Sequence, residues 1–251
     1  MPAPALPNLL LVEGTSDQLF FRALCKTLGL DTRTTVKVAP PRELQASAFN
    51  TKQGVLNHLP VLLRQLDDGQ LRHLGVVIDA DSPPDGGFPA TRDRITRDLA
   101  GFGYSLKPEH PHSTGLLFAH DDGLPDIGVW VMPDNRGDGT LEDWVRRSLH
   151  EGEQPLFDHA CAVVNALPQP HRFRPTQRAK AEMATWLAWQ SRPGFGIDQV
   201  ITSGLLDPDG PDGRPLRDWL LTVFPASHQP APRPSRPRHP RTEHPRQPRR
   251  V

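Results

Sequence analysis

Short apolar runs that alternate with helical patterns constrain the fold of this chain more than any other feature. Residues 9–12 and 74–78 contain only apolar residues and glycine, as is typical of strands buried on both faces. The predicted strands are residues 9–12, 34–38, 74–78, 116–119 and 127–132, and the helices between them are residues 15–28, 53–66 and 91–99. This alternation predicts an α/β fold, with a mostly parallel sheet flanked by helices.

The pattern changes near residue 140. Helical spacing of apolar residues then dominates, with predicted helices at residues 141–149, 156–167, 176–190 and 216–224. We therefore expect an α/β domain at residues 8–139 and a helical C-terminal region at residues 140–225 that packs against the sheet.

Residues 226–251 differ in composition from the rest of the chain. They contain seven Arg, seven Pro and one Glu, with almost no apolar residues, so they are expected to be a disordered tail. Subtracting the tail from the totals of 29 Lys+Arg and 29 Asp+Glu leaves 22 basic and 28 acidic residues in the body. The tail either adds sequence-independent affinity for nucleic acid phosphates or is a plain solvated extension, and both interpretations stay open.

The composition also argues against several classes of protein. No apolar run approaches the ~20 residues of a membrane span, and residues 1–8 lack the basic residues of a secretory signal. We expect a cytoplasmic protein without a membrane partner. Cys25 and Cys161 are the only cysteines and lie far apart in the sequence, which argues against a zinc site and a disulfide framework.

Acidic residues follow two of the predicted strands. Glu13 comes directly after residues 9–12, and Asp79 comes directly after residues 74–78. The carboxyl ends of parallel strands meet at one edge of a sheet, where such folds bind ligands. In an extended segment residues two apart point the same way, so Asp79 and Asp81 are expected to present both carboxylates to one point. Hard oxygen ligands of this kind suit Mg²⁺ or Mn²⁺, and such cations assist phosphoryl transfer.

The same residues resemble the motifs of Toprim domains, which occur in topoisomerases, bacterial primases, ribosomal RNA maturation nucleases and overcoming-lysogenization-defect nucleases. Residues 11–17, Leu-Val-Glu-Gly-Thr-Ser-Asp, resemble the glutamate motif of that family. Residues 76–81, Val-Val-Ile-Asp-Ala-Asp, resemble its Asp-x-Asp motif. Residues 129–135 and 139–143 are similar to a small stand-alone Toprim-like family. The resemblance covers roughly residues 8–225 and implies a Toprim-like sheet followed by a helical part.

The resemblance implies a role for each acid. Glu13 is implied as the general acid or base, and Asp79 and Asp81 as ligands of Mg²⁺ or Mn²⁺. Glu142 is an additional candidate for metal contact, although an acid at the start of a predicted helix is also expected as a cap. Asp17 lies one helical turn after Glu13 and either joins the site or faces solvent.

Basic residues give weaker indications of nucleic acid contact. Lys52 precedes the helix predicted at residues 53–66, where an ammonium and backbone N–H groups can receive a phosphate, but a plain helix start explains it as well. Arg178 and Lys180 lie on a predicted C-terminal helix. They either line a nucleic acid path or cover a solvated face of that helix.

The sequence therefore predicts a Mg²⁺-dependent protein that cleaves phosphodiesters or transfers phosphoryl groups, in the simplest case a nuclease acting on DNA or RNA. Topoisomerase and primase are disfavoured, because Tyr104 is the only tyrosine and zinc-ribbon cysteines are absent from the sequence. A Toprim-like module that binds nucleic acid or protein without catalysis is the main alternative. Asp79 and Asp81 also resemble the nucleophile motif of haloacid-dehalogenase-type phosphatases, but Pro83 departs from that motif. The sequence has no Gly-x-x-x-x-Gly-Lys-[Ser/Thr] loop, so any ATPase partner is expected to be another chain.

Overall fold

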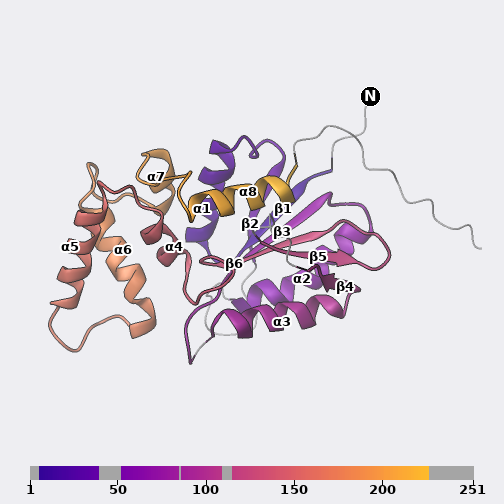
Figure 1. Ribbon diagram of the computed structural model, residues 1–251, viewed down its shortest axis with the longest axis horizontal. Coiled ribbons are helices and arrows are strands. Elements are labelled where there is room, and N and C mark those ends of the chain that lie inside the picture. Colours follow the sequence, from indigo (N-terminus) through magenta and orange to yellow (C-terminus); the bar gives the residue numbers. More distant parts are fainter. Residues whose placement is uncertain (1–5, 40–51, 85, 109–114, 226–251) are drawn as a thin grey trace, which may run out of the picture.

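A six-stranded sheet with the order β2-β1-β3-β6-β5-β4 forms the centre of the protein (Figure 1). The computed structural model describes residues 6–39, 52–84, 86–108 and 115–225. The strands are β1 (Asn8–Val12), β2 (Thr34–Val38), β3 (His73–Asp79), β4 (Tyr104–Leu106), β5 (Leu116–His120) and β6 (Ile127–Met132). β1 pairs in parallel with β2 and β3, and β3 pairs in parallel with β6. The prediction of an α/β fold with a mostly parallel sheet is confirmed.

One edge of the sheet is antiparallel. β5 pairs with β6, and β4 pairs with β5, in antiparallel register. The sequence predicted β5 and β6 but missed β4, which has only three residues, Tyr-Ser-Leu, with one of them buried. Pairing with β5 defines this strand, and no apolar run marks it.

Helices cover both faces of the sheet. In chain order they are α1 (Thr15–Thr27), α2 (Lys52–Asp67), α3 (Phe88–Ala100), α4 (Leu141–Arg147), α5 (Gln154–Asn165), α6 (Arg178–Ala188), α7 (Ile197–Thr202) and α8 (Gly213–Val223), with a short turn of 3₁₀ helix, η1 (Pro175–Gln177), before α6. The sequence predicted every one of these helices except α7, whose six residues are too few to show a helical repeat. Within the described residues, none of the helices is long and apolar enough to cross a membrane.

Alternate residues of the strands point into two separate cores. On β1, Leu9 and Leu11 belong to the core under α2 and α3, whereas Leu10 and Val12 belong to the core under α1 and the C-terminal helices. All four side chains are buried, which explains why this run is apolar without interruption. Figure 1 shows α2 and α3 on one side of the sheet and α1 and α8 on the other.

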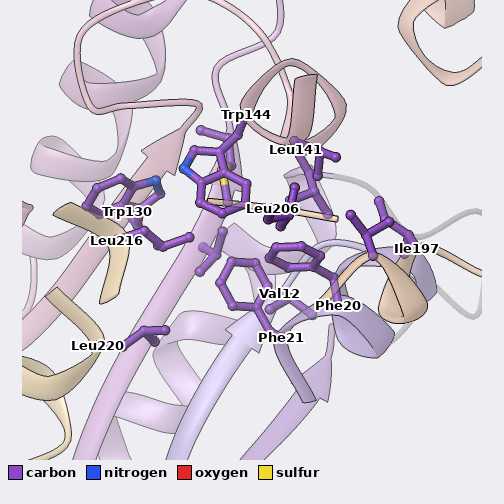
Figure 2. Close-up of a cluster of buried hydrophobic side chains, with 14 of the residues drawn as sticks. Val12, Phe20, Phe21, Trp130, Leu141, Trp144, Ile197, Leu206, Leu216 and Leu220 are labelled. Carbon is purple, nitrogen blue, oxygen red and sulfur yellow. The ribbon is translucent and has the colours of Figure 1, made fainter. Parts of the chain in front are cut away.

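The core on the α1 side joins the sheet to the helical C-terminal part (Figure 2). The ring of Phe20 in α1 meets Trp144 of α4 edge-on, with centroids 5.4 Å apart. A Cβ at Gly75 of β3 would lie 2.9 Å from the ring of Phe224, so glycine allows the end of α8 to approach the sheet closely. Because one core spans both parts, the boundary placed between residues 139 and 140 stays a prediction.

The helices α5 and α6 pack on each other and extend away from the sheet (Figure 1). Phe157 of α5 and Trp186 of α6 lie between them, with ring centroids 5.5 Å apart. α6 also contacts α4, which attaches this helical pair to the rest of the protein. The tail predicted at residues 226–251 lies outside the described residues.

Candidate functional site

The carboxyl ends of β1 and β3 bring Glu13 and Asp79 together. These strands are neighbours in the sheet, and the backbone N–H of Asp79 donates a hydrogen bond of 3.0 Å to Oε1 of Glu13. Oδ1 of Asp79 in turn accepts a hydrogen bond of 3.2 Å from the backbone N–H of Leu141, the first residue of α4. The site therefore combines the sheet edge with the start of the helical C-terminal part.

Asp81 does not continue the strand. β3 ends at Asp79, and Asp81 has a φ of 60°, so the backbone is not extended at this point. The backbone of Asp81 pairs with Gly139 through two hydrogen bonds of 2.9 Å. The argument from strand alternation therefore does not apply to Asp81. Its carboxylate pairs with Lys52, whereas that of Asp79 accepts from Leu141.

Lys52 holds Asp81 in this position. Its Nζ lies 2.6 Å from Oδ2 of Asp81, and it also donates to the carbonyl oxygen of Ala80 at 3.0 Å and to Oγ1 of Thr91 at 3.2 Å. An ammonium group has three donors, so these three acceptors saturate it. The structure thus places Lys52 in the site as a support for Asp81, with its donors used within the protein.

Glu142 and Lys180 form a second ion pair next to Asp79. Nζ of Lys180 lies 2.6 Å from Oε1 of Glu142, and Oγ1 of Thr140 lies 2.8 Å from Oε2 of Glu142. The backbone cap of α4 comes from Asp143 instead, whose Oδ2 accepts a hydrogen bond of 2.8 Å from the N–H of Thr140. Glu142 also lies in the first turn of α4, where the helix dipole favours an acid, so both interpretations of this residue stay open. Its carboxylate is buried, and its charge raises the pKa of Asp79.

Four carboxyl groups, those of Glu13, Asp17, Asp79 and Glu142, influence one another electrostatically. Burial raises the pKa of Glu13 from its ordinary value of 4.5 to about 8, and the charges of Asp17 and Asp81 add to the rise. Burial and the charge of Glu142 raise the pKa of Asp17 to about 6. Burial, followed by the charges of its three neighbours, holds the pKa of Asp79 well above its ordinary range. Asp17 therefore belongs to the site.

Glu13, Asp17 and Asp79 line a cleft of about 1230 Å³ together with Asp81, and these four acids are called its floor. The helical part also lines the cleft, and its residues there, called the wall, include Arg146, Cys161, Asn165, Thr176, Arg178 and Lys180. Arg178 pairs with Glu182 on its own helix at 2.8 Å. Burial alone would lower the pKa of Lys180, but the surrounding carboxylates outweigh it and raise that pKa. The cleft thus has an acidic floor and a wall that carries basic groups.

Sequence reasoning missed Arg146, Asn165 and Thr176 as lining residues. They come from α4, α5 and the turn before α6, and their distance in sequence from Glu13 and Asp79 gives no sign of proximity. The orientation of the α5–α6 pair relative to the sheet decides which of its faces meets the acids. The strand and helix patterns carry no information about that orientation.

The donor chemistry of the floor suits a divalent cation. Oxygen ligands of carboxylates are those that Mg²⁺ prefers, and a cation would relieve the mutual repulsion of partly buried acids. Among the residues that the structure describes, no three Asp, Glu, His or Cys side chains already form a ligand set. Lys52 and Lys180 supply positive charge to Asp81 and Glu142 instead. A cation at this site would therefore compete with the two ammonium groups.

Comparison with known proteins gives a family for the chain. The model of the family designated DUF3226, described as a protein of unknown function, matches residues 7–225. The chain belongs to this family. No curated protein and no solved structure matches it.

Proposed function

We propose that this member of the DUF3226 family is a Mg²⁺-dependent, Toprim-type protein that cleaves phosphodiesters in nucleic acid. The observation that carries the proposal is the meeting of Glu13 and Asp79 at the end of two neighbouring parallel strands, on the floor of a cleft with a basic wall. Ligands of open α/β sheets bind at this edge. A cleft that joins clustered carboxylates to basic side chains is suited to a phosphate together with its cation.

Asp79, Asp81 and Glu142 would hold Mg²⁺ or Mn²⁺ in this proposal. When bound, the cation would neutralise phosphate charge and make a water molecule more acidic. Asp79 is held toward the cleft by the N–H of Leu141, and Asp81 is held by Lys52. These contacts position both carboxylates before any ligand arrives, which reduces the ordering cost of binding.

Glu13 would hold or move a proton at the oxygen that leaves phosphorus. Its Oε1 is fixed by the backbone N–H of Asp79, and the residue lines the cleft. In the absence of a cation, burial raises the pKa of Glu13 to about 8, so its carboxyl group can hold the proton that a general acid donates.

The basic wall would bind the nucleic acid backbone. Arg146, Arg178 and Lys180 all line the cleft that the acids also line. Arginine side chains bind phosphate oxygens through paired N–H donors, and lysine provides a compact positive charge. Such contacts carry no sequence information, so we expect binding without strong sequence preference.

A cleavage assay on the purified full chain tests this function. Labelled single- and double-stranded DNA and RNA are incubated with Mg²⁺, Mn²⁺ or a chelator. We expect cleavage only with a divalent cation, and its loss in Glu13→Gln and Asp79→Asn. Retention of nucleic acid without cleavage would favour the binding module, and hydrolysis of para-nitrophenyl phosphate without cleavage would favour the phosphatase.

A further inference from the structure

The two lysines that neutralise the acids differ in how firmly they are held. Lys52 has three acceptors, and 18% of its side chain is exposed. Lys180 has a side chain that is 57% exposed, and within the described ranges Glu142 is the acceptor that lies within ion-pair distance of it. Lys52 is therefore part of the rigid frame, whereas Lys180 is tied down by a single contact.

Lys180 neutralises the same acids that would hold a cation. The side chain of Glu142 is only 6% exposed, so its charge needs a partner, and the ammonium of Lys180 supplies one at 2.6 Å. Lys180 also lies close enough to Asp79 and Asp17 to interact electrostatically with both. A divalent cation bound to Asp79 and Glu142 would repel this ammonium and neutralise the carboxylate that now binds it.

The position of Lys180 gives the displaced ammonium a second partner. Lys180 comes from α6, on the wall of the cleft that also carries Arg146 and Arg178. A phosphate that entered between this wall and the acidic floor would be within the range of a flexible four-carbon side chain. The single contact to Glu142 could then be exchanged for a contact to phosphate without moving the helix.

We propose that Lys180 is an exchangeable counter-ion, which neutralises Glu142 before a divalent cation binds and transfers to the substrate phosphate afterwards, so that cation and phosphate bind cooperatively. This inference rests on the proposed function, because it assigns Glu142 and Asp79 to the cation. Cooperativity follows from linkage: each ligand removes a cost of binding the other, and the coupling must be the same in both directions.

The test measures Mn²⁺ binding to the chelator-treated full chain by isothermal titration calorimetry, with and without thymidine 5′-monophosphate as the phosphate probe. Without the probe, Lys180→Met should bind Mn²⁺ about tenfold more tightly than the parent, because a competing charge is removed. The probe should tighten Mn²⁺ binding several-fold in the parent and hardly at all in Lys180→Met. Lys180→Arg, which keeps the charge, should behave like the parent.

Two further variants keep the result interpretable. Lys180→Gln removes the charge but can still donate a hydrogen bond to Glu142, so it should show the same tightening even if Lys180→Met folds poorly. Lys107→Met breaks a comparable pair, 2.6 Å from Nζ of Lys107 to Asp126, outside the cleft, and should leave Mn²⁺ affinity unchanged.

The outcomes separate this inference from the function on which it rests. If the parent binds Mn²⁺ but Lys180→Met and Lys180→Gln bind it equally or more weakly, the exchange is wrong and the metal site stands. If the parent binds no Mn²⁺, the proposed function and the exchange are both wrong.

Discussion

The polar residues at the carboxyl ends of β1 and β3 differ from those at the amino ends in charge and in hydrogen bonding. At the carboxyl ends, Glu13 and Asp79 are acids that line a cleft, and each accepts a hydrogen bond from a backbone N–H group. At the amino ends, Asn8 and His73 pair in register with each other, and Asn8 pairs with Thr34 of β2. In the described part of the chain, Oδ1 of Asn8, Nε2 of His73 and Oγ1 of Thr34 are buried and have no hydrogen-bond partner.

This contrast shows what distinguishes a site from buried polarity. A polar side chain at a strand end is common to both edges and indicates little by itself. Of the two edges, the carboxyl edge combines charge, a cleft and an exposed counter-charge, Lys180. At the amino edge, the buried polar atoms of Asn8, Thr34 and His73 are expected to destabilise the folded state, since buried polar groups without partners do so.

The largest expected effect comes from removing one acid of the carboxyl edge. Asp79→Asn should lower divalent-cation-dependent cleavage by at least about 10²–10³-fold, because the cation loses a charged ligand. The free energy of unfolding of the chelator-treated protein should stay the same or rise, since like-charge repulsion is relieved while Oδ1 can still accept from Leu141. Initial cleavage rates and urea unfolding curves measure the two effects.

Asp134→Asn is a matched control near the same edge of the sheet. Asp134 lies outside the cleft, and hydrogen bonds from Gly137 and Arg136 together with the charge of Arg147 outweigh burial and lower its pKa. This variant should keep its activity and lose about 1 kcal/mol of stability, with the loss of its ion pair to Arg147. The comparison of edges would have to be abandoned if Asp79→Asn destabilised the protein more than Asp134→Asn.

Sequence and structure agree where local patterns decide the outcome. The apolar runs before Glu13 and Asp79 predicted parallel strands that end at one edge of the sheet, and the structure has these strands, as direct neighbours, with both acids at that edge. The departure of Asp81 from the strand depends on its pairing with Gly139, which lies far along the chain. The pairing of Glu142 with Lys180 depends on how α6 packs against α4, and packing of this kind is not encoded in a local repeat.

The next effect concerns the pH dependence of stability, to which Glu13, Asp17 and Asp79 contribute with the same sign because the pKa of each is raised. The pKa of Glu13 is about 8 in the folded protein and 4.5 ordinarily, so the folded state holds a proton that the unfolded state releases between these values. The stabilisation that comes from protonation of Glu13 is therefore fully present below pH 4.5, and it is lost as the pH rises to about 8. In chelator-treated protein, the free energy of unfolding of Glu13→Gln relative to that of the parent should rise by a few kcal/mol between pH 5 and pH 8.5. This is the order of magnitude that a pKa shift of this size implies.

Urea unfolding at both pH values, with and without Mg²⁺, measures this gain. Mg²⁺ should shrink it, because a cation stabilises the ionised carboxylates of the parent. A gain that did not depend on pH would mean that Glu13 is already ionised in the folded protein, and the proton-transfer role would lose its support.

The smallest effect tests the amino edge, where a polar group should be a cost. Thr34→Val replaces the buried hydroxyl group with a methyl group of similar size, so it should raise the free energy of unfolding by about 1 kcal/mol. Thr35→Val, at the exposed neighbouring position on β2, should change it by less than about 0.5 kcal/mol. A loss of more than about 1 kcal/mol in Thr34→Val would show that the hydroxyl has a partner, such as an ordered water shared with Asn8 and His73. The amino edge would then be a satisfied polar network, and burial without partners could no longer be what separates it from the carboxyl edge.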